Sequence, residues 1–228
     1  MGEMNRWVSV WGNAVSVAEN RPERYAKNIT IRYPIHIPFS GEGVRLTFDN
    51  YCGTEDITLS KITVFYGGEF YPVTLNGARE IHIPAGERVV TDPLSVVLNA
   101  QELIRVSFYL ADFTLMRSVV YTCGPLSEGI YANGDETENA DIDIETSRKT
   151  HLFYFLSNVS VLTDPEKRAI VCYGDSNTKY YFGDLQQDGP NEGSYPAKLQ
   201  ELFRAHGFPN VRVLNCGFPD TQTDFALT

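Results

Sequence analysis

Ser176 is the residue of this chain whose surroundings point most directly to chemistry. It lies in Ile-Val-Cys-Tyr-Gly-Asp-Ser-Asn-Thr (170–178), where four apolar or aromatic residues precede a polar turn. The apolar run predicts a short buried strand over about 169–173, and Gly174 predicts a tight exit from it. Because reactive groups of α/β proteins gather at the carboxyl ends of strands, we expect Ser176 within two residues of such an end, as a candidate nucleophile.

A serine nucleophile needs a base within hydrogen-bond reach, and donors where negative charge develops. The chain contains four histidines, and none of them ends an Asp-x-x-His pattern: His36, His82, His151 and His206. The first three fall in the β-rich part of the chain, and His206 falls at the expected end of a helix. We therefore predict structural or surface roles for all four, and no evident base for Ser176.

The first two thirds of the chain predict β-structure. Apolar and polar residues alternate with the strand period of two, for example over 44–50 and 103–111. Gly67-Gly68 predicts a hairpin between two such runs. Short strands separated by regular turn signals indicate an antiparallel β-sandwich, of jelly-roll type, over residues 1–162, and residues 44–123 are expected to be almost entirely antiparallel strand.

The pattern changes near residue 163, and residues 163–228 are expected to form a second domain. The strand before Ser176 is followed by a helix, with Ser194 as its N-cap and Gly207 as its C-terminal glycine, and then by a buried strand over 210–217. Strand, helix and strand predict a βαβ unit with parallel strands. The expected apolar face of the helix consists of Tyr195, Leu199, Leu202 and Phe203.

The segment from Gly174 to Thr178, Gly-Asp-Ser-Asn-Thr, resembles the first sequence block of SGNH/GDSL serine esterases. Val-Leu-Asn-Cys-Gly, which ends at Gly217, resembles the start of their second block. Four earlier segments resemble the β-rich N-terminal domain of one subgroup of this family, and they occur in the same order: 6–16, 44–64, 81–94 and 103–110. The resemblance covers nearly the whole chain.

The resemblance implies a flavodoxin-like α/β domain that hydrolyses acyl esters, with acetyl esters of carbohydrates as one substrate class and no cofactor or metal. Ser176 would be the nucleophile, and the backbone N–H groups of Ser176 and Asp220 would stabilise the oxyanion. The supporting motif residues are Gly174, Asp175, Asn177, Asn215 and Gly217. Asp175 has a further expected role, which is to bind the amides of its own turn.

The sequence also departs from the family pattern. Asp220 stands where the second block carries a glycine, and its negative charge opposes an oxyanion. The family's Gly-x-Asn-Asp and Asp-x-x-His blocks are not found in the 228 residues. We therefore expect an incomplete hydrolase domain that is inactive in this chain alone. The alternative is a non-catalytic β-sandwich that binds carbohydrate or protein and carries a hydrolase remnant. A fragment and a true short product both fit the sequence.

Two other groups of residues have a functional and a structural interpretation. The acidic run over 133–145 lacks the spacing of an EF-hand, so a solvated loop is favoured over a calcium site. Four aromatic residues could line a sugar-binding face, but core positions are favoured for them: Trp7, Trp11, Tyr131 and Tyr154.

The composition limits the partners. The formal net charge of −10 opposes binding to nucleic acid. We find neither a signal peptide nor a membrane-spanning stretch, and the four cysteines match no zinc or disulfide pattern. These features predict a cytoplasmic protein with reduced thiols. An incomplete βαβ unit leaves a parallel strand edge unpaired, which favours self-association.

Overall fold

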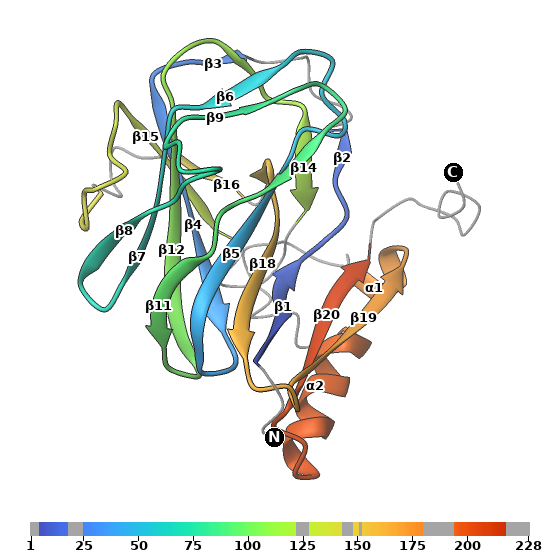
Figure 1. Ribbon diagram of the computed structural model, residues 1–228. Coiled ribbons are helices and arrows are strands. Elements are labelled where there is room, and N and C mark those ends of the chain that lie inside the picture. The colour runs from blue at the N-terminus through green and yellow to red at the C-terminus, as the bar shows by residue number, and fades with distance from the viewer. Residues whose placement is uncertain are drawn as a thin grey trace.

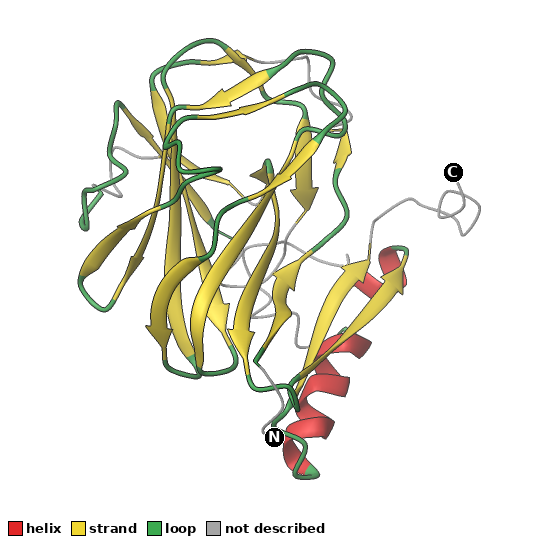
Figure 2. Ribbon diagram, in the orientation of Figure 1, coloured by secondary structure: helices red, strands yellow, loops and turns green. Residues whose placement is uncertain are grey.

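Most of the chain folds into antiparallel β-sheets, as the alternating sequence predicts (Figure 1). The computed structural model describes residues 5–17, 25–121, 128–142, 148–150, 152–179 and 194–217. Every strand pair described between residues 44 and 121 is antiparallel, and that stretch contains no helix (Figure 2). The prediction for this region is therefore confirmed for the described residues. No described helix has the length and apolar character needed to cross a membrane.

Two large sheets form the main body. The first has the strands β1 (Arg6–Gly12), β18 (Leu156–Thr163), β5 (Gly41–Asp49) and β10 (Arg88–Val90) in that order, with β11 (Leu94–Leu98) also paired to β5. The second has the order β16 (Arg148–Thr150), β15 (Gly129–Asn133), β4 (Ile29–Ile37), β12 (Glu102–Leu110), β7 (Lys61–Tyr66) and β8 (Glu69–Pro72). These two sheets are called the sandwich below.

Within the described chain, short strands form three smaller sheets. They pair as β2 (Ser16–Val17), β14 (Ser118–Tyr121) and β17 (Leu152–Tyr154), as β3 (Tyr25–Ala26) with β13 (Thr114–Leu115), and as β6 (Ile57–Leu59) with β9 (Ile81–Ile83). The predicted hairpin joins β7 to β8. Gly67 and Gly68 have φ of 60° and 86°, the left-handed values that a two-residue turn of this type requires.

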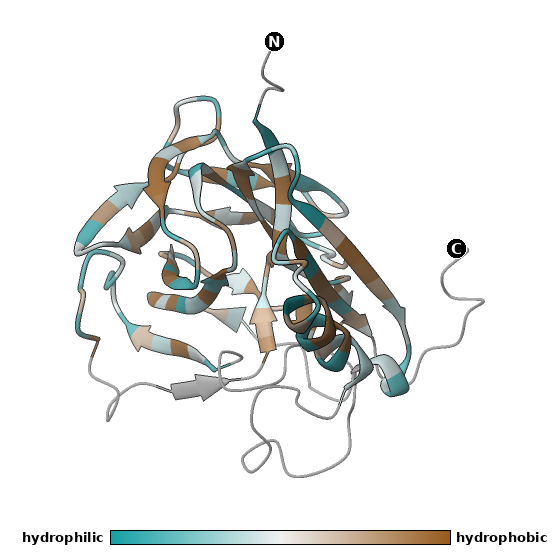
Figure 3. Cartoon of the chain, turned by 90° about the horizontal axis from the view of Figure 1, so that it is seen from below, coloured by the Kyte–Doolittle hydropathy of each residue, from teal (hydrophilic) through white to brown (hydrophobic). Residues whose placement is uncertain are grey.

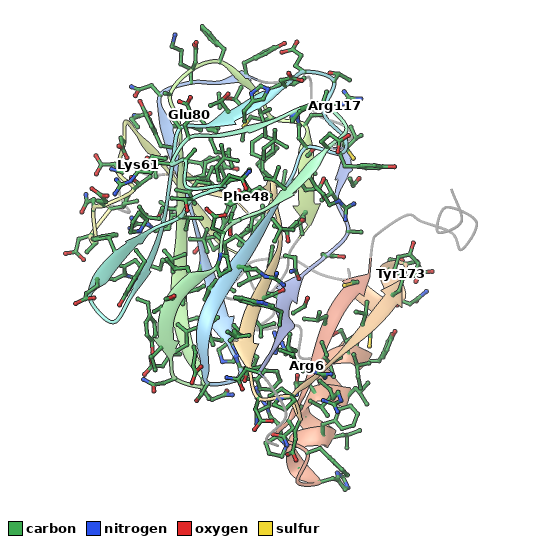
Figure 4. All side chains as sticks on the ribbon, in the orientation of Figure 1. Arg6, Phe48, Lys61, Glu80, Arg117 and Tyr173 are labelled. Atoms are coloured by element: carbon green, nitrogen blue, oxygen red, sulfur yellow. The ribbon has the colours of Figure 1, made fainter. Side chains whose placement is uncertain are left out.

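Aromatic rings join the two sheets through a common core. Phe48 of β5 and Phe108 of β12 come from different sheets, and their ring centroids are 5.6 Å apart in an edge-to-face contact. Tyr33 of β4 stacks on Phe153 at 3.9 Å, and its hydroxyl accepts a hydrogen bond of 2.6 Å from the Tyr154 backbone. Figure 4 shows Phe48 inside the sandwich.

Residues 168–179 and 194–217 form a smaller unit that we call the α/β segment. It contains β19 (Arg168–Gly174), α1 (Ser176–Lys179), α2 (Tyr195–Ala205) and β20 (Val211–Gly217). β19 and β20 pair in parallel, with Arg168 opposite Val211 and Gly174 opposite Gly217. Ser194 caps α2 through a hydrogen bond from the Ala197 N–H, and Gly207 has a φ of 79°. The predicted order of strand, helix and parallel strand is confirmed.

The prediction that β19 is buried is wrong. Three of its apolar side chains are exposed, namely Ile170 (36%), Val171 (58%) and Tyr173 (52%). Among the described strands β19 pairs only with β20, so its other edge is unpaired and its side chains are only partly covered. Tyr173 is labelled near the upper end of β19 in Figure 4.

The predicted apolar face of α2 is also only partly correct. Leu199 and Phe203 are half-buried, but Tyr195 and Leu202 are exposed, because α2 packs mainly on β20. Figure 3 shows hydrophilic and hydrophobic residues alternating around the turns of α2.

Candidate functional site

Ser176 lies two residues beyond the end of β19 and is the first residue of α1, so its predicted position is confirmed. The side chain is half-buried. Its hydroxyl forms no hydrogen bond with another described residue. Ser176 therefore stands at the carboxyl end of a parallel strand, where Figure 1 shows α1 at the tips of β19 and β20.

Gly174 allows the chain to turn sharply before Ser176. A Cβ atom at this position would lie closer than 3.0 Å to Thr178 Oγ1, and 3.2 Å from Thr178 Cβ. Thr178 is itself buried, with 5% of its surface exposed, so it cannot simply rotate away into solvent. Glycine is thus required for the first turn of α1 to pack on the strand end, and this packing fixes the position of Ser176.

Asp175 holds the turn together. Its Oδ1 accepts hydrogen bonds from the Asn177 backbone N–H at 2.9 Å and from Asn177 Nδ2 at 3.1 Å, and its backbone carbonyl accepts one from the Thr178 N–H. These bonds are those of an N-cap residue. The predicted structural role of Asp175 is confirmed, and Asn177 has the same role through its amide.

The end of β20 lies beside Ser176 because Gly217 pairs with Gly174. Asn215 Oδ1 accepts a hydrogen bond of 3.1 Å from the Gly217 N–H, while Asn215 Nδ2 is buried and has no partner among the described residues. The two sequence blocks therefore meet at one edge of the sheet. Asp220, the expected second oxyanion donor, lies outside the described residues.

Asn13 borders this edge, and the sequence did not identify it as a site residue. Its Nδ2 donates a hydrogen bond of 3.4 Å to the Gly217 carbonyl, and Cys216 Sγ donates one of 3.5 Å to the Gly12 carbonyl. The end of β1 is thereby fixed against the end of β20. The only local signal was the Gly-Asn pair that follows β1, which gives no indication of a partner more than 200 residues away.

None of the three described histidines is placed beside Ser176. His206 follows α2 and its ring contacts the Leu202 carbonyl. The end of α2 lies near the start of β19 and β20, where the Arg168 N–H donates a hydrogen bond to the Asn210 carbonyl. Ser176 follows the other end of β19, so a strand length of about 20 Å separates it from His206.

The other two described histidines belong to the sandwich. The pKa of the His36 ring on β4 is lowered by burial and by the nearby guanidinium groups of Arg212 and Arg204. Because Arg204 belongs to the last turn of α2, His36 lies near that turn. His82 on β9 forms an exposed contact of 3.2 Å with Asp56. His151 lies outside the described residues.

The four aromatic residues considered for sugar binding serve the fold. The guanidinium of Arg45 stacks on Trp7, with 4.1 Å between the guanidinium carbon and the ring centroid. Trp11 and Tyr131 pack against the core, and Tyr154 is buried within it. Core positions are confirmed for Trp11, Tyr131 and Tyr154, but not for Trp7, which lines a groove next to β1.

The acidic loop is tied to the sandwich by a lysine. Lys61 of β7 contacts Asp135 and Glu138, each at 3.2 Å. The described residues contain no cluster of three or more His, Cys, Asp or Glu side chains that could hold a metal ion. Within the described chain Cys52, Cys172 and Cys216 are free thiols, and the last two are buried as expected.

A groove of about 610 Å³ separates the outer face of the first sheet from the α/β segment. Polar residues of the sandwich line one side, including Asn13, Asp49 and Asn158, while Val171 and Leu214 line the other. Asp49 is buried, which raises the pKa of its carboxyl group, and its Oδ2 is 3.6 Å from Arg88 Nε. Ser176 does not line this groove.

Comparison with known proteins leaves the family open. No model of a known protein family matches the chain, and no curated protein matches its sequence.

The packing of Gly174 on Thr178 gives a direct test of the turn. We expect Gly174→Ala to lower the free energy of local opening of β19 and β20 by about 1–3 kcal/mol, because the added methyl overpacks the site. Amide hydrogen exchange over residues 168–174 and 211–217 measures this.

Thr178→Ala supplies the control, because it removes the hydroxyl that the new methyl would meet. In that background Gly174→Ala should cost measurably less. An equal cost in both backgrounds would show that contact with Thr178 is not the reason for glycine.

Proposed function

We propose that the α/β segment is the first part of an SGNH-type serine ester hydrolase domain, in which Ser176 occupies the position of the nucleophile. The observation that carries the proposal is the register of β19 with β20. Because Gly174 lies opposite Gly217, β19 and β20 end at the same edge of the sheet, and Ser176 lies two residues beyond that end of β19. The nucleophile and an oxyanion donor of an α/β hydrolase need this arrangement.

The chemistry follows from the resemblance of the sequence blocks. Ser176 Oγ would attack the acyl carbonyl of an ester, and a base would take the hydroxyl proton and return it to the leaving alcohol. Water would then attack the acyl-serine and release the acid. We propose acyl esters as the substrate class, with acetylated carbohydrates as the first to test.

We further propose that this chain alone is not an efficient esterase. A general base contributes about 10²–10⁴-fold to rate, and it must lie within hydrogen-bond reach of the hydroxyl. His36 and His206 lie at the opposite end of the α/β segment, and His82 pairs with Asp56 on the sandwich. The members of such a triad act as a unit, so a nucleophile alone retains little activity.

The groove beside β1 favours a second candidate function, a binding module. Its polar side offers the amides of Asn13 and Asn158, groups that hydrogen-bond sugar hydroxyls, and its other side is apolar. The groove does not require Ser176. Saturable binding of a glycan that Asn158→Ala weakens and Ser176→Ala leaves unchanged would favour this function.

The ester hydrolase proposal is tested with para-nitrophenyl acetate. We expect the wild-type chain and Ser176→Ala to release nitrophenol at the same rate across neutral pH, because no described histidine reaches the hydroxyl. Ser95→Ala, a change at an exposed serine of β11, is the matched control. A wild-type rate about tenfold or more above that of Ser176→Ala alone would show that a base reaches Ser176, and the account of an incomplete site would be wrong.

The exposed edge of β19 leads to a proposal about self-association. We propose that two copies of this chain pair through β19 in antiparallel orientation. If the pairing is centred on Val171, Arg168 of one copy lies opposite Gly174 of the other copy. Arg168 then lies next to Asp175 of that second copy, so opposite charges meet at both ends of the paired strands. The exposed side chains of Val171 and Tyr173 would be covered.

A charge at the centre of this edge should prevent pairing. We expect the wild-type chain to form dimers with rising concentration and Val171→Lys to remain monomeric, as measured by sedimentation velocity. Val97→Lys is the matched control, since Val97 on β11 is 76% exposed and lies away from the edge. A wild-type chain that stays monomeric throughout, or equal effects of the two variants, would contradict the proposal.

A further inference from the structure

The cleft between the sandwich and α2 collects positive charge in an otherwise acidic protein. The cleft has a volume of about 410 Å³, and its only charged lining residues are Lys167 and Arg204. His36 and Arg212 lie close behind it, as their electrostatic interactions with Arg204 show. The chain as a whole carries a formal net charge of −10. A local excess of cations against this background requires a physical reason.

These cations have neutral partners among the described residues. Arg204 Nη2 donates to Gln101 Oε1 at 3.4 Å, and Arg212 Nε donates to the Val10 carbonyl at 3.1 Å. Lys167 Nζ donates to Asn210 Oδ1 and lies 5.7 Å from the centroid of the Phe39 ring. No ion pair within the described chain joins any of them to a carboxylate.

The pKa values of two neighbouring groups are lowered by burial and by the nearby charges. Burial and the charge of Arg204 lower the pKa of Arg212 to about 10. Burial and the two arginines also lower the pKa of His36 below its ordinary value. Arg212 and His36 are partly buried beside the exposed Arg204, and an anion placed near these groups would offset their like charge.

Gln101, which lines the cleft, has a strained backbone conformation. Its backbone φ is 67°, a left-handed value that is unfavourable for glutamine. The conformation is held by the Gln101 N–H, which donates to Ile37 at 2.7 Å, and by Nε2, which donates to Pro38 at 3.0 Å. As a result the side-chain oxygen faces Arg204 and fixes that guanidinium at the cleft.

We propose that this cleft binds a phosphate or sulfate group between Arg204 and Lys167. Guanidinium groups bind such oxyanions through paired, charge-assisted hydrogen bonds, and a lysine adds a point charge. Ser40 Oγ accepts a hydrogen bond from the Ala100 N–H, so its own proton is available to the anion. The bound group links Arg204 of α2 with the sandwich and so holds the α/β segment in place. The site lies at the opposite end of β19 from Ser176 and does not depend on the proposed esterase function.

Isothermal titration calorimetry with inorganic phosphate at constant ionic strength tests the site. We expect saturable binding to the wild-type chain that weakens by about tenfold or more in Arg204→Gln, because a charged hydrogen-bond donor is lost. Lys198→Gln is the matched control. It removes the same charge from α2, but Lys198 is exposed and pairs with Glu201, so phosphate affinity should change less than twofold.

Two further arms complete the experiment. Phenyl phosphate replaces inorganic phosphate, and equal affinity would show that the cleft accepts the group when it is carried on an organic molecule. Weaker binding would show that the free anion is the ligand. Circular dichroism without phosphate verifies that each variant is folded. Lack of saturable binding by the folded wild-type chain, or equal affinity in Arg204→Gln, would overturn the proposal.

Discussion

β20 is held from two sides, and the placement of the candidate site depends on this double attachment. On one side it forms the parallel ladder with β19 that brings Gly174 level with Gly217. On the other side the sandwich binds its two ends, through Arg212 and the Val10 carbonyl and through Asn13 and the Gly217 carbonyl. A two-stranded sheet is marginal in water by itself, so the α/β segment depends on the sandwich for its stability.

This attachment places two different surfaces at the two ends of the same strands. The carboxyl end carries Ser176, the turn that Asp175 holds, and the contact with Asn13. The amino end carries Arg204, Arg212 and Lys167, beside the last turn of α2. Since both surfaces include residues of the sandwich, a rearrangement between the sandwich and the α/β segment would alter both of them together.

The sequence predicted those features that depend on neighbours along the chain. Period-two alternation identified the strands, Gly67-Gly68 identified a hairpin, and Ser194 and Gly207 marked the ends of α2. The position of Ser176 followed in the same way from an apolar run and a glycine. Each of these signals arises from local backbone geometry or side-chain periodicity, so a single sequence carries it.

Features that depend on distant residues were not predictable. The apolar run of β19 indicated burial, but burial depends on which elements cover the strand, and only β20 pairs with it among the described residues. Asn13 and Arg212 gained their roles through contacts with residues more than 200 positions away. The cationic cleft likewise forms only when α2 packs beside the turn at Gln101.

The central proposal is that Ser176 occupies a nucleophile's position without an activating base among the described residues. Its most direct measurement is the rate at which diisopropyl fluorophosphate modifies Ser176, followed by peptide mass spectrometry, with exposed Ser95 as the reference within the same molecule. The account predicts that the two serines react at similar, slow rates at neutral pH. Modification of Ser176 faster than Ser95 by about 10²-fold or more, the smallest contribution expected of a general base, would contradict it.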